Sequence, residues 1–178
     1  MIGESKYDLK ETYELNKQLG CGSYSIVFEA RHRHSGELRC IKKIGKENFT
    51  KEEEESIMNE IAVLRETDHP HIIKIMEYYQ NERNLYIVME RLEGGELFDR
   101  IIELKCLNES YARILMRQIL SAVSYLHKKN IVHRDIKPEN LMLETKKPDS
   151  HLKLIDFGTS RRYRADQKLK ARSEEHTS

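Results

Sequence analysis

Few cysteines and no long apolar runs exclude several classes of protein. The three cysteines, Cys21, Cys40 and Cys106, are widely spaced and odd in number, which fits neither a disulfide framework nor a zinc site. The longest apolar run, from Leu85 to Met89, is far too short to cross a membrane. The N-terminus also lacks the apolar core of a signal peptide. The composition therefore predicts a protein of a reducing, cytoplasmic compartment without a membrane segment.

An excess of one charge sign is also lacking. The chain has 178 residues, of which 34% are charged, but 31 Lys and Arg balance 30 Asp and Glu and leave a formal net charge of +1. A near-neutral chain lacks the long-range field of a dedicated nucleic-acid binder, so we do not expect nucleic acid as a partner. Only the basic stretch from Arg161 to Arg172 favours that alternative. The length suits one domain with a real core.

The front of the chain is rich in predicted strands. Residues 1–10 are polar and predict a loose lead-in. Ile57, Ile61 and Leu64 recur at helical spacing and predict a helix over residues 51–67. Alternating or apolar runs predict strands at residues 13–19, 26–28, 38–44, 72–79 and 85–89.

Helical periodicity dominates after Gly94-Gly95. The clearest helix begins after the cap residue Asn108 and extends to Lys128. Its apolar stripe consists of Tyr111, Leu115, Ile119, Ala122 and Leu126. A strand-rich front followed by a helical section predicts an α+β fold.

A glycine-rich turn separates the first two predicted strands. Gly20 and Gly22 flank Cys21, and glycines allow backbone N–H groups to approach phosphates closely. The turn alone is a weak signal, because a simple tight hairpin is at least as common. A strand follows it, so it is not the nucleotide-binding motif that opens a helix.

Glu60 lies on the inward face of the predicted helix, between Ile57 and Leu64. A buried carboxylate needs a cation, because breaking a buried ion pair costs about 3–5 kcal/mol. Lys42, on a neighbouring predicted strand, is the best candidate partner. A glutamate at the edge of the stripe that reaches solvent is the equally weighted alternative.

Two polar loops carry the strongest chemical signal. The stretch from His133 to Asn140 holds an acid, two cations and an amide, and Asp156 follows an apolar run. Carboxylate and amide oxygens are the ligands that Mg²⁺ prefers, so Asn140 and Asp156 are candidates to hold a metal–nucleotide complex. Each loop alone is an ordinary solvated turn, but the joint order of the motifs argues strongly against that interpretation.

With these motifs in this order, the chain resembles a eukaryotic protein kinase catalytic domain. Lys137, two residues after Asp135, is typical of Ser/Thr kinases, and Gly94 to Ile101 is similar to the calcium/calmodulin-dependent and calcium-dependent group. The resemblance implies a two-lobed fold with a complete small β-rich lobe and an incomplete helical large lobe. We expect a lead-in at residues 1–12, the lobes at 13–92 and 93–164, and a non-family tail, a possible sequencing artefact, at 165–178.

The resemblance also implies ATP and Mg²⁺ as cofactors and proteins as substrates. Leu19, Gly20 and Gly22 would cover the nucleotide, while Lys42, positioned by Glu60, would hold its phosphates. In the polar loops, the expected roles are proton acceptor for Asp135, charge neutralisation at the γ-phosphate for Lys137, and metal binding for Asn140 and Asp156.

The same resemblance assigns the adenine site and the regulatory residues. Met89 would be the gatekeeper, followed by a hinge of Glu90, Arg91 and Leu92. Arg134 would pair with a phosphorylated segment. The adenine ring would lie between Val27, Cys40 and Met142; an apolar spine would contain Leu64, Ile75, His133 and Phe157; and basic residues of substrates would be read by Glu96 and Glu139.

Three departures from the family pattern bear on activity. Ser25 replaces the third glycine of the turn, Cys40 replaces the usual alanine, and the chain ends soon after Gly158. We therefore expect this fragment to lack activity and its helix 108–128 to leave the apolar stripe uncovered. The alternative function is a nucleotide-binding pseudokinase or scaffold. Regulation by a calcium sensor outside this chain is a further expectation.

Overall fold

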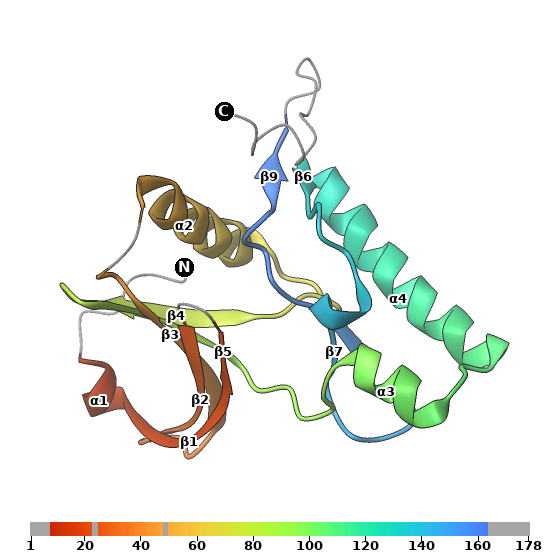
Figure 1. Cartoon of the computed structure of the whole chain (residues 1–178), viewed down its shortest axis with the longest axis horizontal. Coiled ribbons are helices and arrows are strands. Elements are labelled where there is room, and N and C mark those ends of the chain that lie inside the picture. The colour runs from red at the N-terminus through yellow and green to blue at the C-terminus, as the bar shows by residue number, and fades with distance from the viewer. Residues whose placement is uncertain (1–7, 23–24, 48–49, 164–178) are drawn as a thin grey trace.

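The computed structural model describes residues 8–22, 25–47 and 50–163. A sheet with one covering helix forms one side of the molecule, and two helices with small two-stranded sheets form the other (Figure 1). The first part contains α1 (Leu9–Thr12), β1 (Tyr13–Cys21), β2 (Ser25–His32), β3 (Leu38–Gly45), α2 (Lys51–Glu66), β4 (Ile75–Gln80) and β5 (Asn84–Glu90). The tail predicted at residues 165–178 lies outside the described residues.

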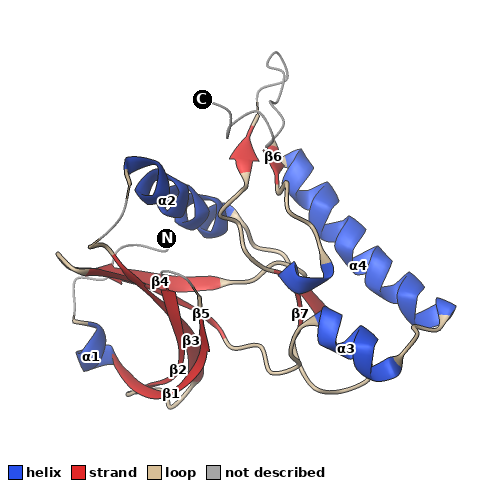
Figure 2. Cartoon of the chain, in the orientation of Figure 1, coloured by secondary structure: helices blue, strands red, loops and turns tan. Residues whose placement is uncertain are grey.

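The second part follows β5 and is mainly helical (Figure 2). Its elements are α3 (Leu97–Leu104), α4 (Glu109–Lys128), β6 (Ile131–Val132), a 3₁₀ turn (Pro138–Asn140), β7 (Leu141–Leu143), β8 (Leu152–Leu154) and β9 (Arg161–Arg162). This arrangement confirms the predicted α+β, two-lobed fold, and we call the two parts the small and the large lobe.

The small lobe is a five-stranded antiparallel sheet with the order β1-β2-β3-β5-β4. One face packs against α2 and includes Ile44 and Ile87 in the main core. A second, smaller core contains Leu9, Tyr13, Ala30, Ile41, Tyr79 and Val88. The lead-in is therefore less loose than predicted, because Asp8 caps α1 and Leu9 is buried in this second core.

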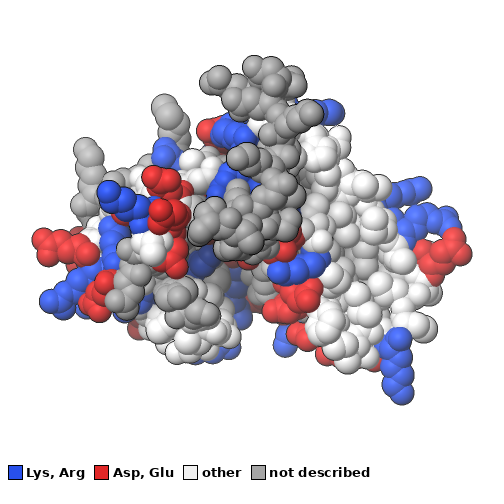
Figure 3. Space-filling view, turned by 45° about the horizontal axis from the view of Figure 1, so that its top comes forward, with Lys and Arg blue, Asp and Glu red and all other residues white. Residues whose placement is uncertain are grey.

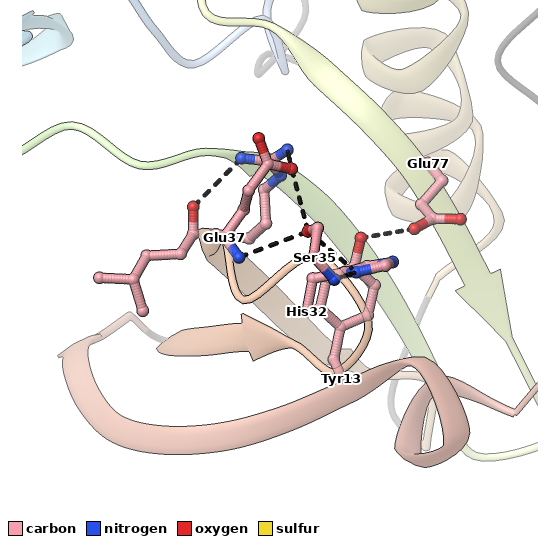
Figure 4. A network of polar contacts seen from close by, with 7 residues as sticks. Tyr13, His32, Ser35, Glu37 and Glu77 are labelled. Atoms are coloured by element: carbon pink, nitrogen blue, oxygen red, sulfur yellow. Dashed lines mark hydrogen bonds and ion pairs between the residues drawn. The ribbon is translucent and has the colours of Figure 1, made fainter.

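The sheet is strongly curved, because its two edge strands meet. β1 and β4 lie at opposite ends of the strand order, yet the Tyr13 hydroxyl donates a hydrogen bond to Glu77 Oε1 at 2.6 Å (Figure 4). Burial and this carboxylate raise the pKa of Tyr13 well above its ordinary value. At the β2–β3 turn, the Ser35 hydroxyl contacts both His32 and Glu37. The Tyr13–Glu77 bond thus links the two edge strands, and the Ser35 contacts hold the turn.

Helix α2 follows the sequence prediction closely. Thr50 and Glu53 form a capping box at its N-terminus, which satisfies backbone N–H groups that have no partner within the helix. Ile61 and Leu64 are buried in the main core, as their spacing predicts. The strand predicted at residues 72–79 begins only at Ile75. Ile72 instead lies in a parallel bridge with Leu154 of β8, in which the Ile73 N–H donates to Leu154 O and the Leu154 N–H donates to His71 O, and this bridge joins the lobes.

The apolar stripe of α4 is covered, contrary to the sequence prediction. Asn108 caps the helix, and Leu115, Ala122 and Leu126 are buried in the main core. A different set of apolar side chains is exposed: Ile102 (59%), Ile114 (51%), Met116 (50%) and Leu120 (60%). In Figure 3 the side occupied by the helices shows a broad surface without charged side chains. None of the described helices is long and apolar enough to cross a membrane.

Candidate active site

The sheet register places four predicted nucleotide-binding residues on one face. Val27 lies opposite Lys42, and Cys40 lies opposite Met89. Directly paired residues share a face of the sheet, and so do residues two apart on one strand. Val27, Cys40, Lys42 and Met89 therefore form one surface. This is also the face that α2 covers farther along β3, at Ile44.

The glycine-rich turn lies at the end of the β1–β2 hairpin. Gly20 pairs with Val27, and the Gly22 N–H donates to Ser25 O at 2.7 Å. Leu19 is 44% exposed. The tip of the turn, residues 23 and 24, lies outside the described residues. The described part is a hairpin, which both a phosphate-binding turn and a simple tight hairpin require. Its phosphate-binding role therefore stays a prediction.

Lys42 and Glu60 form the ion pair that the sequence predicted. Lys42 Nζ lies 3.4 Å from Glu60 Oε1, and the Glu60 side chain is only 7% exposed. Burial raises the pKa of Glu60, the Lys42 ammonium opposes this rise, and Asp156 adds to it. Lys42 therefore favours the ionised form of a carboxylate that its surroundings would otherwise neutralise.

The polar loop 133–140 brings three predicted functional side chains into contact. Lys137 Nζ lies 2.9 Å from Asp135 Oδ2, and Asn140 Nδ2 donates to Asp135 O and Oδ2 at 2.8 and 3.0 Å. The hydrogen bond to Asp135 raises the pKa of Lys137. The 3₁₀ turn with Pro138 at its start folds Asn140 back toward Asp135. A carboxylate is thus held between a cation and an amide.

The ring of His133 stabilises this loop through hydrogen bonds to the backbone. Its Nδ1 accepts a hydrogen bond from Asp135 N–H at 3.3 Å, so its Nε2 carries the proton donated to Ile155 O at 3.1 Å. Burial lowers the pKa of His133, which favours this neutral form. Its ring packs edge-to-face on Phe157, with 4.7 Å between centroids. The predicted spine residues, Leu64, Ile75, His133 and Phe157, are all buried.

Asp156 is exposed and has a left-handed backbone with φ of 60°. Its Oδ1 accepts a hydrogen bond from Gly158 N–H at 3.2 Å. Asp156 and Asn140 offer a carboxylate and an amide oxygen, and the Asn140 hydrogen bonds use only its Nδ2. Within the described residues, no group of three His, Cys, Asp or Glu is arranged to hold a metal ion. Two oxygen ligands suit a cation that keeps waters and phosphate oxygens in its shell.

The segment after β5 connects the lobes. Among the described residues, nothing accepts the backbone N–H of Leu92, which leaves a donor at the predicted adenine edge. Met142 of β7 forms a bridge with Glu96. Gly94 packs directly on the end of β7, because a Cβ there would lie 2.5 Å from Leu143 Cβ and 2.3 Å from Thr145 O just beyond the strand. The predicted hinge and the large-lobe side of the adenine site are therefore neighbours.

Sequence reasoning missed two residues of α2. The Ser56 hydroxyl donates to Gly158 O at 2.7 Å, and Asn59 Nδ2 donates to Ser160 O at 2.9 Å. Ser56 lies four residues before Glu60 on the same helix face, which is the signal that would have identified it, whereas no such spacing points to Asn59. Glu96 and Glu139, by contrast, are exposed and form no ion pair with described residues. Arg134 donates from Nε to Thr159 O at 2.8 Å.

Comparison with known sequences identifies the family. The protein kinase domain model matches residues 13–177, so the chain belongs to the protein kinase domain family. It is 41% identical over 171 residues to calcium-dependent protein kinase 4 of Plasmodium falciparum, a match that covers 95% of this chain and 32% of the relative.

Two further relatives belong to the same broad group. Calcium/calmodulin-dependent protein kinase type 1B of Rattus norvegicus is 44% identical over 161 residues, covering 90% of this chain and 47% of the relative. Myosin light chain kinase A of Dictyostelium discoideum is 40% identical over 154 residues, covering 86% and 52%. The chain thus spans about half or less of the length of these relatives.

Proposed function

We propose that the protein is an ATP-dependent protein serine/threonine kinase that transfers the γ-phosphate of Mg-ATP to Ser or Thr hydroxyls of proteins. The observation that carries the proposal is the contact between Asp135, Lys137 and Asn140, which joins a base, a cation and a metal-ligand candidate in one loop. Family membership supports the same reaction class.

The small lobe would hold the nucleotide. Val27 and Cys40 would line one side of the adenine ring and Met142 the other, and the Leu92 N–H would donate a hydrogen bond to its edge. Lys42 would hold the phosphates, and its 3.4 Å contact with Glu60 keeps the ammonium in place. Mg-ATP, when bound, supplies the phosphoryl group and a divalent charge that Asn140 and Asp156 would anchor.

The large lobe would handle the proton and the charge. Asp135 is positioned by Asn140 to accept the proton of the substrate hydroxyl at its carboxylate. Lys137, beside it, neutralises negative charge at the transferred group. Positioning and charge neutralisation are the main requirements of phosphoryl transfer, which explains why the set contains no covalent nucleophile.

Phosphate transfer from radiolabelled ATP to a protein substrate, measured on a version with the complete kinase domain because we expect the 178-residue chain itself to be inactive, tests the proposal. We expect Asp135→Asn to reduce transfer by about 10²–10⁴-fold, the usual contribution of a positioned base, while Mg-ATP binding persists. Asp149→Asn, a change at an exposed carboxylate, is the matched control and should leave transfer unchanged. Nucleotide binding without transfer in the version with the complete kinase domain would instead favour the pseudokinase or scaffold alternative.

Substrate choice follows from the exposed acids. Glu96 at the start of α3 and Glu139 in the 3₁₀ turn are available to contact basic residues near the phosphorylated position. Removing both charges with Glu96→Gln and Glu139→Gln should abolish any preference for arginine in a peptide library, while Glu103→Gln serves as control. A library phosphorylated without arginine preference by the unmodified protein would contradict this assignment.

The setting of the enzyme is part of the proposal. The three free thiols, at Cys21, Cys40 and Cys106, support a reducing, cytoplasmic environment. The names of two relatives refer to calcium, which supports regulation by a calcium sensor outside this chain. Measuring transfer with and without calcium, in the presence of a calcium-binding regulator, tests this point.

A further inference from the structure

Two consecutive hinge residues send their side chains to opposite lobes. Arg91 Nη2 lies 2.8 Å from Glu29 Oε2 of β2, in the small lobe. Glu90 Oε1 lies 2.9 Å from Lys153 Nζ of β8, in the large lobe. The same Glu90 oxygen accepts the Lys74 N–H at 2.7 Å. The connection between the lobes is therefore tied on both sides by charged contacts.

These ion pairs differ from ordinary surface pairs in their burial. The side chains of Arg91 and Glu29 are 20% and 12% exposed, and those of Lys153 and Glu90 are 10% and 21% exposed. The pair between Arg113 and Glu109 on α4 has the same 2.8 Å separation but is 61% and 89% exposed. Solvent screens an exposed pair of this kind, whereas breaking a partly buried one leaves a poorly solvated charge.

The Arg91 pair also adjoins the proposed nucleotide site. Glu29 lies two residues beyond Val27 on β2 and directly opposite Cys40, so all three share the proposed adenine-facing surface. Burial raises the pKa of Cys40 to about 11, and the Arg91 guanidinium opposes this rise, which places that charge close to the thiol. Neither Glu29 nor Arg91 has a role in the proposed chemistry.

We propose that Glu90 and Arg91 form a hinge clamp, in which Arg91 is a positioning residue for the nucleotide. The Glu29–Arg91 pair fixes β2, and with it Val27, relative to the hinge backbone at Leu92. The Glu90–Lys153 pair fixes the same backbone relative to β8 and hence to Met142, its neighbour in the β7–β8 register. The clamp sets the separation of the surfaces that enclose adenine. This inference rests on the proposed kinase function.

Charge exchange tests the clamp. Glu29→Arg or Arg91→Glu alone should weaken binding of Mg-ATP, measured with a fluorescent ATP analogue, by about fivefold or more, as coupled residues do. The double variant restores opposite charges between positions 29 and 91 and should bind more tightly than either single variant, although it loses the second contact of Arg91, with Glu93 Oε1 at 2.7 Å. In phosphate transfer, the single changes should raise KM for ATP and leave kcat unchanged. The exposed pair, exchanged by Glu109→Arg and Arg113→Glu, is the matched control.

Two outcomes separate the clamp from the proposed function. If the unmodified protein binds ATP and both single variants bind it equally well, the clamp is wrong and the kinase proposal stands. If the unmodified protein binds no ATP, both are wrong. Should a charge-reversed variant fail to fold in thermal denaturation, Glu29→Gln keeps the shape of the side chain and must still weaken binding. A kcat loss at unchanged KM would also overturn the assignment.

Discussion

The two lobes each use a lysine–carboxylate pair, but in opposite surroundings. Lys42 and Glu60 come from a strand and a helix, and Glu60 is almost completely buried. Lys137 and Asp135 lie in one loop, with Lys137 46% and Asp135 18% exposed. A buried pair joins distant segments and strongly penalises the loss of one partner. An exposed local pair contributes little to stability and can exchange its partner for a substrate.

The largest expected effect is that of breaking the buried pair. Lys42→Met should abolish phosphate transfer and weaken ATP binding less, because the adenine contacts persist. It should also lower the free energy of unfolding by about 3 kcal/mol, the low end for a broken buried pair, since Lys42 is 26% exposed. Chemical denaturation measures the loss. The double variant with Glu60→Gln should recover most of the stability and none of the activity.

Acidification should destabilise the loop that carries the exposed pair. Because burial lowers the pKa of His133, folding favours its neutral ring. The stability it contributes is complete above the ordinary histidine pKa of about 6.5 and is lost as pH falls through the lower folded pKa. Melting temperatures measured without metal, from neutral pH downward, should fall less steeply for His133→Gln. If the melting temperatures of the variant and the unmodified protein fell in parallel with pH, His133 would make no contribution. His69 and His71, whose pKa values are also lowered, account for any pH dependence that remains in the variant.

A smaller effect is expected where α2 contacts the Asp156 segment. Ser56→Ala leaves Gly158 O without its donor and should cost about 1 kcal/mol, with a similar cost for Asn59→Ala at Ser160 O. Glu55→Ala, at an exposed position of the same helix, is the control. Ser56→Ala should also slow phosphate transfer, because Ser56 shares its helix face with Glu60, four residues on. If the destabilised variants kept full phosphate transfer, the contact between α2 and the Asp156 segment would have no role in the active site.

The exposed pair should give the smallest change in stability. Lys137→Ala should leave the melting temperature unchanged and sharply reduce phosphate transfer. Substitution of a purely structural residue would instead lower the melting temperature. A clear drop in melting temperature would show that the two lysine pairs are more alike than their exposure indicates.

Local patterns in the sequence predicted most of the fold. The spacing of Ile57, Ile61 and Leu64 located α2 to within a residue. The inward position of Glu60 left a cation partner and a solvent-reaching side chain equally open, and the structure has the pair with Lys42. Predictions failed where an apolar run admits two structures. Ile72 and Ile73 have the composition of a strand, but they bond to β8 instead of extending β4.

Apart from the Lys42–Glu60 pair, long-range partners could not be predicted. Nothing in the sequence joins Glu29 to Arg91, because both belong to ordinary charged stretches and only the sheet register brings them together. The stripe on α4 was identified correctly, but periodicity does not reveal how many neighbours cover a helix. Periodicity alone also gave no sign that Ile114, Met116 and Leu120 would be the exposed side chains.

The close approach of Gly94 to β7 has a consequence for how this chain tolerates change. Every other amino acid adds a Cβ, which would lie 2.3 Å from Thr145 O and 2.5 Å from Leu143 Cβ, so the backbone itself must move. At the adjacent Gly95 nothing lies within 4 Å of a Cβ, and only the φ of 77° limits the choice. In a saturation library, position 94 should therefore reject all nineteen alternatives, whereas position 95 should admit asparagine and aspartate, which tolerate that backbone.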